Sequence, residues 1–251
     1  MIRAVMTPAR RLFGEFRELI LIFALMLVAG TAIGQPFIVP SGSMEPTLQV
    51  GDEIAAAKFP YGYSRFSAPF GLMPDFKGRI LAQPPQRGDV VVFALPRDPS
   101  QTYVKRVIGL PGDRIQMKGG QLFINGREVP RQAVGPVTVM SDGRPVRGME
   151  YRETLPNGRA HDIIKLAAGA LDDTPEFTVP ADSYFMMGDN RDNSLDSRVA
   201  ATAGGVGFVP AENLVGRVDR VLFSVTPHES VLQAVANPSE FRLSRLLHAV
   251  Q

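Results

Sequence analysis

Two serines, Ser41 and Ser43, lie in the turn-rich segment PSGSMEPTL at residues 40–48, directly after a long apolar stretch. A serine hydroxyl is a weak nucleophile and attacks a carbonyl group only when a neighbouring base accepts its proton. The GxSxG elbow of many hydrolases is not formed, because glycine flanks Ser43 on one side only. The segment is therefore either a linker or a serine active site that uses another base.

A lysine can be that base if it is neutral near physiological pH. An exposed lysine has a pKa of about 10.4, but burial among apolar groups can lower this pKa by roughly 3–5 units. Among the few lysines of the chain, Lys105 stands out because it lies in a bulky strand-like run, TYVKRVI at residues 102–108. Strand periodicity alone favours a solvent-facing Lys105, so the pattern leaves both interpretations open.

A third polar cluster, GDNRDNSLDSR at residues 188–198, follows an apolar strand-like run. Its Asp, Asn and Ser side chains are typical of a hydrogen-bonded loop. A calcium loop is disfavoured, because the glycine and glutamate positions of an EF-hand are not met and two arginines lie inside the cluster.

Metal and cofactor sites are not expected. The chain has no cysteine, and His161, His228 and His248 are far apart in sequence. We expect these histidines to be surface or loop residues rather than metal ligands. Phosphate-binding glycine motifs are also missing from the sequence.

The apolar stretch predicts a membrane anchor. Residues 19–39 contain no charged side chain, and a helix needs roughly 20 apolar residues to cross a bilayer. Arginines precede the stretch, whereas the first cation after it is Lys58. The positive-inside tendency then predicts a cytoplasmic segment at 1–18, an anchor at 19–39 and an exported domain at 40–251. The alternative is a cleavable signal peptide with its site near 30–32.

The exported domain is predicted to be mainly β, with antiparallel sheets. Five strand or hairpin signals support this fold class, and they lie at residues 90–93, 102–108, 121–129, 183–187 and 215–225. Residues 131–175 are interpreted as a variable β excursion. The N-terminal 18 residues hold four arginines and two glutamates, so the totals of 27 cations and 25 anions leave 23 of each sign in the remainder. This neutral body disfavours a nucleic-acid partner.

Four motifs, in one order after one apolar segment, resemble those of the bacterial type I signal peptidases, which are membrane-bound Ser/Lys endopeptidases. The motifs are PSGSMEPTL, RGDVVVF, YVKRVIGLPGD and GDNRDNSLDSR. The resemblance covers roughly residues 36–130 and 180–250, and it implies an antiparallel-sheet catalytic body on a single N-terminal transmembrane helix.

The resemblance also implies a role for each matching residue. Ser43 matches the nucleophile and Lys105 the general base, while Ser41 and the Ser43 backbone N–H match the oxyanion hole. Ser194 matches a serine that orients the lysine by a hydrogen bond, and Asp196 and Arg198 match a supporting charged pair. The shallow apolar walls of the substrate pockets are matched by Phe37, Val39, Pro40, Met44, Leu48, Tyr103 and Val104.

The implied activity is removal of signal peptides from exported preproteins, after small-x-small sequences such as Ala-x-Ala. The implied partners are these preproteins and the lipid bilayer, and the enzyme is expected to be a monomer without metal or cofactor. Its expected location is the bacterial inner membrane, with the catalytic domain outside the cytoplasm. Two alternatives stay open: a specialised Ser/Lys peptidase for a single pilin or conjugation protein, and an inactive membrane-tethered β scaffold.

Overall fold

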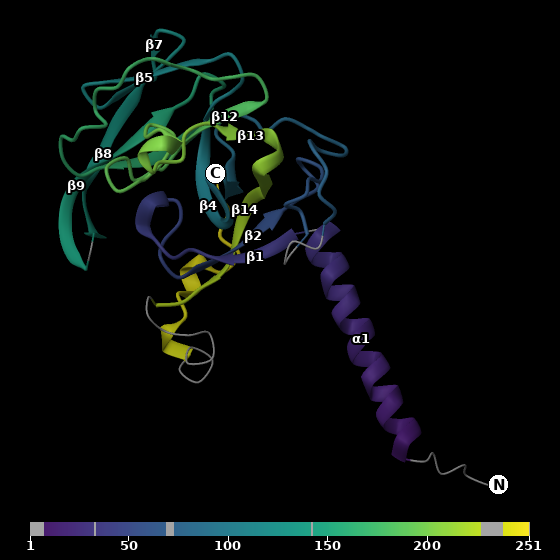
Figure 1. The fold of residues 1–251 in the computed structure, drawn as a ribbon. Coiled ribbons are helices and arrows are strands. Elements are labelled where there is room, and N and C mark those ends of the chain that lie inside the picture. The colour runs from purple at the N-terminus through teal and green to yellow at the C-terminus, as the bar shows by residue number, and fades with distance from the viewer. Residues whose placement is uncertain (1–7, 33, 69–72, 142, 227–237, 251) are drawn as a thin grey trace.

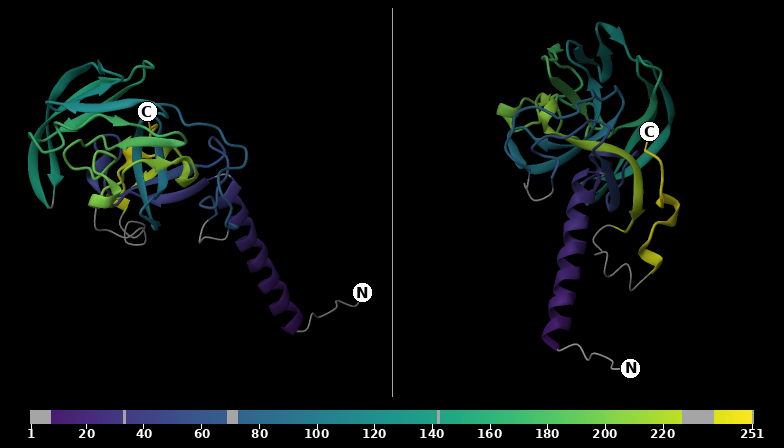
Figure 2. Two further views of the ribbon diagram at one scale, coloured as in Figure 1. Left: turned by 45° about the horizontal axis from the view of Figure 1, so that its top comes forward. Right: turned by 90° about the vertical axis from the view of Figure 1, so that its right-hand side faces the viewer.

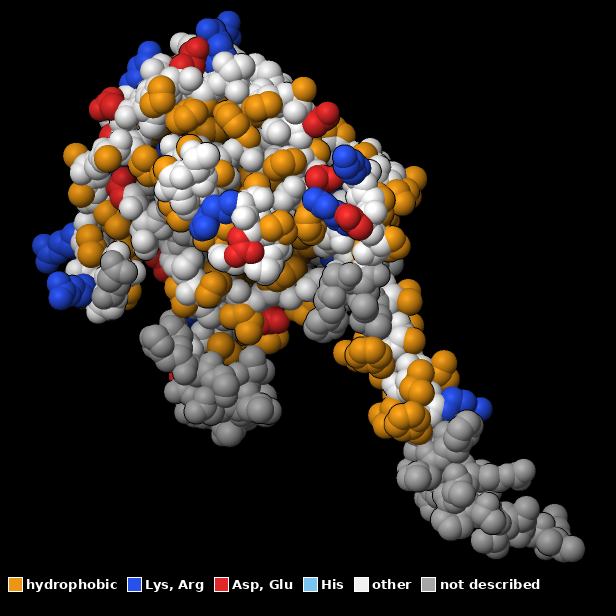
Figure 3. Space-filling view, viewed as in Figure 1, with side chains coloured by type: hydrophobic (Ala, Val, Ile, Leu, Met, Phe, Trp, Pro, Cys, Tyr) orange, Lys and Arg blue, Asp and Glu red, His pale blue; other side chains and the backbone are white. Residues whose placement is uncertain are grey.

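The structure is a computed structural model that describes residues 8–32, 34–68, 73–141, 143–226 and 238–250. It begins with helix α1 (Pro8–Ala32), which projects from a β-rich body (Figures 1 and 2). Much of the helix surface is apolar, as the orange side chains of Figure 3 show. Its exposed large apolar residues include Phe16, Leu19, Ile20, Leu21, Ile22, Phe23, Leu25, Met26 and Val28.

The predicted anchor at 19–39 is helical only as far as Ala32. Strand β1 (Gly34–Ile38) follows and pairs with β2 (Asp52–Ala57). Pro36 cannot continue a helix but is tolerated in an edge strand, and a Cβ at Gly34 would lie 2.9 Å from the Ala56 carbonyl oxygen. The apolar run therefore divides between two elements, since the close approach at Gly34 and the proline both favour the strand.

Over the described residues, no helix combines the length and the apolar character of a membrane-crossing segment. The first seven residues of the predicted cytoplasmic segment lie outside the described part of the chain.

A sheet of seven strands forms the centre of the body. Its strands lie in the order β1-β2-β14-β3-β4-β12-β13. The strands β3 and β4 come from the predicted runs at 90–93 and 102–108, and β12 and β14 from those at 183–187 and 215–225. Their bounds are β3 (Val90–Leu95), β4 (Asp98–Gly109), β12 (Ser183–Met187), β13 (Val209–Pro210) and β14 (Leu214–Ser224).

Two smaller sheets complete the described body, with strand orders β11-β5-β6-β7 and β10-β9-β8. All pairings between named strands are antiparallel, which confirms the predicted mainly-β, antiparallel fold class. The sheet of β8, β9 and β10 lies within residues 131–175, the segment predicted to be a variable β excursion. The bounds are β5 (Arg114–Lys118), β6 (Gln121–Ile124), β7 (Arg127–Glu128), β8 (Arg131–Ser141), β9 (Arg144–Thr154), β10 (Ala160–Lys165) and β11 (Phe177–Thr178).

Candidate active site

Ser43 lies in a short 3₁₀ helix, Gly42–Met44, that follows β1. Only 7% of Ser43 is exposed, and its carbonyl oxygen accepts a 3.2 Å hydrogen bond from the Asn190 backbone N–H. The serine segment is thus fastened to the distant loop at 188–198. This contact brings two of the polar clusters of the sequence together.

Lys105 lies on β4 and points at the serine. Its Nζ donates a 2.7 Å hydrogen bond to Ser43 Oγ and a 3.0 Å bond to the Val104 carbonyl. The Tyr103 ring centroid is 5.6 Å from the same nitrogen. Lys105 is only 4% exposed, so the solvent-facing alternative does not describe this lysine.

Burial is the main influence on the protonation of Lys105. It lowers the pKa of the lysine to about 8, although the carboxylates of Asp196 and Asp189 act in the opposite direction. Because neither hydrogen-bond acceptor of Nζ carries a charge, the ammonium form gains little from direct partners. A substantial fraction of Lys105 is therefore neutral in mildly alkaline solution.

Ser41 lies beside the same group. Its hydroxyl donates to Ser43 Oγ across 3.4 Å, and its backbone is extended where it precedes the 3₁₀ helix. The Ser41 side chain can therefore reach the space around Ser43 Oγ.

The Asp196–Arg198 pair is buried near Lys105. Arg198 Nη2 lies 2.8 Å from Asp196 Oδ2, and the same carboxylate oxygen accepts a 3.0 Å bond from the Gly188 N–H. Burial acts to raise the pKa of Asp196, but the Arg198 guanidinium and these hydrogen bonds hold it below its ordinary value. Asp196 is therefore ionised. Its contacts with Gly188 and Arg198 hold together the two ends of the loop at 188–198.

Ser194 does not make the hydrogen bond that the resemblance implies. The bonds of Lys105 Nζ go to Ser43 and Val104 instead, whereas the buried Ser194 hydroxyl adds to the hydrogen bonding that lowers the pKa of Asp196. Ser194 packs against Gly188, next to the Ser43 carbonyl. The structure therefore gives Ser194 a packing position beside Ser43.

Gly188 allows this close packing, and the substitution Gly188→Ala is expected to disturb it. A Cβ at Gly188 would lie 2.2 Å from Ser194 Oγ and 2.5 Å from the Ser43 carbonyl oxygen. Overpacking of this kind costs about 1–3 kcal/mol, and it would displace Ser43. We expect a lower free energy of unfolding and a reduced kcat, measured by denaturation and peptide cleavage. Gly169→Ala, at a position open within 4 Å, is the matched control, and equal behaviour of the two variants would contradict the prediction.

The sequence analysis missed a second buried ion pair, between Arg106 and Asp189. Both side chains are 1% exposed and their closest atoms are 2.7 Å apart; Thr47 Oγ1 also donates to Asp189 Oδ2 at 2.6 Å. Burial acts to raise the pKa of Asp189, but Arg106 holds it below its ordinary value. The signal was available in the sequence, because Arg106 lies in the strand-like run at 102–108 and Asp189 closely follows the apolar run at 183–187. A charged residue in such a run needs a partner.

The β8–β10 sheet packs against the loop at 188–198. Ile164 N–H donates to the Asp189 carbonyl and Arg191 N–H donates to the Ile164 carbonyl, both at 2.9 Å. Arg191 also forms a buried ion pair with Glu153 on β9, with 3.0 Å between Nη1 and Oε2. The excursion at 131–175 is therefore a brace for the loop that carries Ser194 and Asp196.

His161 belongs to this brace, which corrects its expected surface or loop position. It lies on β10, is 5% exposed, and its Nε2 is 3.5 Å from Glu153 Oε1. Burial lowers the pKa of His161 well below its ordinary value, and Arg106 adds to the effect. His161 is therefore neutral. His228 lies outside the described residues.

The variant Glu153→Gln is expected to weaken the brace. It would leave the buried Arg191 guanidinium without its anionic partner, and removing one member of a buried pair costs about 3–5 kcal/mol. We expect a loss of this size in the free energy of unfolding, measured with denaturant, together with reduced cleavage. Asp162→Asn breaks the Arg152–Asp162 pair on the same sheet, whose arginine is 58% exposed. An equal loss in this control variant, expected to cost only about 0–1 kcal/mol, would argue against the brace.

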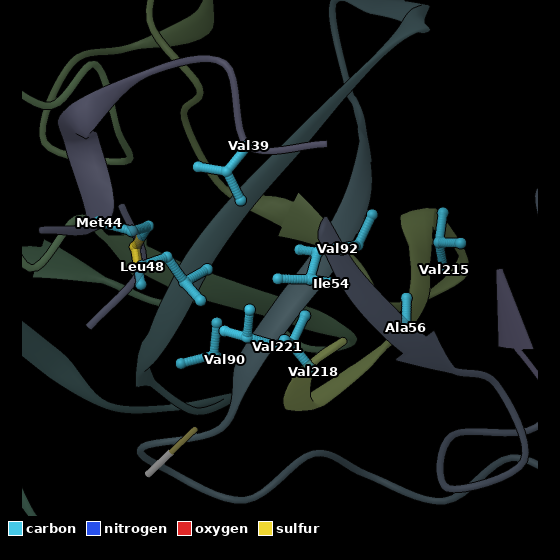
Figure 4. Close-up of a cluster of buried hydrophobic side chains, with 10 residues drawn as sticks. All are labelled: Val39, Met44, Leu48, Ile54, Ala56, Val90, Val92, Val215, Val218 and Val221. Atoms are coloured by element: carbon cyan, nitrogen blue, oxygen red, sulfur yellow. The ribbon is translucent and has the colours of Figure 1, made fainter. Parts of the chain in front are cut away.

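A cleft of about 400 Å³ opens beside Ser43 and Lys105. Its walls include four of the predicted pocket residues, Phe37, Pro40, Tyr103 and Val104, together with Ile54 and Val92. The other three predicted pocket residues, Val39, Met44 and Leu48, do not line it. They are at most 1% exposed and pack into a core cluster with Val90 and Val221 (Figure 4). Their side chains point into the protein because the short segment after β1 must itself be held to the sheet.

Metal-ion ligands do not gather in the described part of the chain, where no group of three or more His, Asp or Glu side chains is placed to hold an ion.

Comparison with known proteins places the chain in one family. Residues 13–223 match the family described as signal peptidase, peptidase S26. The signal peptidase I of Rickettsia typhi is 42% identical over 218 residues, which cover 84% of this chain and 80% of that protein. The chain belongs to the signal peptidase family. The signal peptidase I of Rickettsia prowazekii is 41% identical over 218 residues, covering 84% of this chain and 80% of that protein.

Family membership confirms the resemblance found in the motifs, and the chain is a serine endopeptidase of signal-peptide processing. A crystal structure of a signal peptidase I from Enterococcus faecalis is 28% identical. The match covers 54% of this chain and 97% of that chain, with a TM-score of 0.30.

Proposed function

We propose that this signal peptidase uses Ser43 as its nucleophile and Lys105 as its general base. The observation that carries the proposal is the 2.7 Å contact between Lys105 Nζ and Ser43 Oγ, made by a lysine that is only 4% exposed. A base must lie within hydrogen-bond reach of the proton that it removes. Burial also lowers the pKa of Lys105 to about 8, so that its neutral form is accessible.

In the first step, neutral Lys105 accepts the Ser43 proton while Oγ attacks the scissile carbonyl. The Ser43 backbone N–H and the Ser41 hydroxyl stabilise the oxyanion, and one such donor is typically worth about 2.7–4 kcal/mol. The lysine then protonates the leaving amine, which breaks the peptide bond and leaves an acyl-enzyme on Ser43. In the second step Lys105 activates a water molecule that hydrolyses this ester. Asp196 and Arg198 support the loop behind the dyad and take no part in proton transfer.

The substrate is an extended segment with small residues at the −3 and −1 positions. Side chains two residues apart point to the same side of an extended chain, so both can enter the cleft beside Ser43. Phe37, Pro40, Tyr103 and Val104 line this cleft, and we expect shallow pockets between them to admit alanine and exclude larger side chains, which would favour Ala-x-Ala sequences.

Helix α1 is proposed to anchor the enzyme in the bacterial inner membrane as a monomer. Apolar side chains such as Leu19, Leu21 and Leu25 are more than half exposed on this helix, and lipid would cover them. Since arginines lie at the N-terminal end, the positive-inside tendency places that end in the cytoplasm and the β body outside it. Ser43 then lies close to the membrane surface, where a signal peptide ends.

The test is cleavage of a preprotein with an Ala-x-Ala site by the detergent-solubilised full chain, with the new N-terminus determined by sequencing. We expect a single cut after the −1 alanine and no cut when that alanine is replaced by leucine. Folded protein that cleaves no such preprotein would overturn the proposal and favour a specialised processing peptidase or an inactive scaffold.

A further inference from the structure

A fully buried lysine, Lys58, joins helix α1 to the β body. Its Nζ donates to the Gly30 carbonyl at 2.6 Å and to Gln35 Oε1 at 3.1 Å. The same nitrogen also donates to the Ser67 carbonyl. These acceptors belong to the last turn of α1, to β1 and to the segment that follows β2. Because a lysine ammonium has three N–H donors, each of them holds a different segment of the chain.

The bond to Gly30 caps the C-terminal end of α1. The last four carbonyl groups of a helix have no partner within the helix, and a cation near this end interacts favourably with the helix dipole. The last turn of α1 itself contains no basic side chain. Lys58 therefore supplies this cation from the β body.

The pairing of β1 with β2 places Lys58 at the point where α1 passes into the sheet. Gly34, the first residue of β1, pairs with Ala57, so that Lys58 follows directly beside this junction. At its other end β1 stops at Ile38, and Ser43 follows five residues later. The direction of α1 and the position of Ser43 are therefore linked through one short strand.

Hydrogen bonds rather than ion pairs hold the Lys58 ammonium. Its three acceptors are two carbonyl oxygens and one amide oxygen, none of them charged. Burial consequently lowers the pKa of Lys58 to about 8. An unpaired cation is a costly group to bury, and an apolar side chain would serve core packing at less cost. What the ammonium adds is direction, since a fully satisfied buried polar network makes its surroundings rigid.

From this geometry we infer that Lys58 is a positioning residue, which fixes the orientation of the β body, and with it Ser43, relative to the membrane that holds α1. The inference rests on the proposed function, including the anchoring by α1. Helix α1 projects away from the body (Figures 1 and 2), so its direction is set at the junction that Lys58 holds.

The orientation matters for one kind of substrate. A preprotein whose signal peptide lies in the bilayer presents its cleavage site at a fixed depth, so Ser43 must be held at the matching position. A soluble peptide with the same cleavage site can approach the cleft beside Ser43 from any direction. Loss of the Lys58 contacts should therefore slow cleavage of the embedded preprotein and spare cleavage of the soluble peptide.

The test compares the full-length wild type with Lys58→Met on these two substrates. Enzyme and preprotein are reconstituted into the same phospholipid vesicles, and the peptide is added in solution. Methionine has a similar length but donates no hydrogen bond. We expect kcat/KM for the embedded preprotein to fall about 10- to 100-fold, because a displacement of about 1 Å can cost about 10²-fold in rate, while kcat/KM for the peptide stays within about twofold.

Lys77→Met is the matched control, because it makes the same change at an exposed lysine and should leave both activities unaltered. An unchanged ratio of the two activities in Lys58→Met would overturn the inference. An equal loss on both substrates in the folded variant would also overturn it, since Lys58 would then act on the active site itself. A wild-type enzyme that cleaves neither substrate would instead overturn the proposed function.

A distance measurement tests the same junction without a change at Lys58. The chain has no cysteine, so cysteines introduced at the exposed residues Glu18 on α1 and Glu128 on β7 can carry two spin labels. Pulsed electron paramagnetic resonance in vesicles should then give a single narrow distance distribution, which broadens when Lys58→Met is added. A broad distribution in the labelled enzyme that retains Lys58 would show that the junction does not fix the body, and it would overturn the inference even if Lys58→Met fails to fold.

Discussion

The variant Lys105→Met is expected to lower kcat by about 10²–10⁴-fold, the usual contribution of a positioned general base. Methionine fills a similar volume beside Ser43 but cannot accept the Oγ proton. Ser43→Ala is expected to reduce kcat at least as much, because no acyl-enzyme can form. Since the two groups act on one step, the double variant should be no slower than Ser43→Ala alone. The measurement is single-turnover cleavage of an Ala-x-Ala preprotein.

Lys77→Met is the control for this prediction, because Lys77 is an exposed lysine that does not line the cleft beside Ser43. It should cleave as fast as the wild type. Full activity of a folded Lys105→Met enzyme would mean that another group removes the proton, and the proposed mechanism would then fail.

The second large effect is a dependence of kcat/KM on pH that follows the protonation state of the Lys105 amine. Only the neutral amine can act as a base, and the pKa of Lys105 is lowered to about 8 by burial. Activity should therefore rise with pH up to about 8 and level off above it. Below this value the neutral fraction falls about tenfold per pH unit, so that kcat/KM near pH 6 should be about a hundredfold below the plateau.

The profile is measured with a peptide that carries no titratable group, in buffers of constant ionic strength between about pH 6 and about pH 10. The free energy of unfolding at each pH serves as the control for loss of folded enzyme. An inflection near pH 10, where an exposed lysine titrates, or a flat profile would contradict the assignment of Lys105.

Several elements of the fold could be predicted because their patterns are local. The Asn125-Gly126 turn has φ values of 54° and 77°, as a two-residue hairpin loop requires, and β6 and β7 flank it as expected. The runs at β3, β4, β12 and β14 are apolar enough to be recognised as strands without knowledge of their partners. Their order in the sheet depends on long-range pairing, which the sequence pattern does not contain.

The residues of the candidate site could likewise be predicted only in part from the sequence. Ser43 and Lys105 were found through motif resemblance, because strand periodicity could not decide which way Lys105 points. Met44 and Leu48 were assigned to the pocket through the same resemblance, yet both side chains pack into the core, and Met44 does so from the 3₁₀ helix. The contact of the β8–β10 sheet with the loop at 188–198 was missed because it joins residues far apart in the chain. Glu153 and its partner Arg191, for example, are 38 residues apart, and a periodic pattern reports only local structure.

The most direct test of the central claim is an NMR titration of the lysine side chains in the full-length enzyme, labelled with ¹³C and ¹⁵N at lysine. The chain has five lysines, Lys58, Lys77, Lys105, Lys118 and Lys165. Burial lowers the pKa of Lys58 and of Lys105 to about 8, and the variants Lys58→Met and Lys105→Met assign their signals. We predict that the signal lost in Lys105→Met titrates near pH 8. If that signal titrates near the ordinary lysine pKa of about 10.4, Lys105 is charged throughout the working range and cannot be the base that activates Ser43.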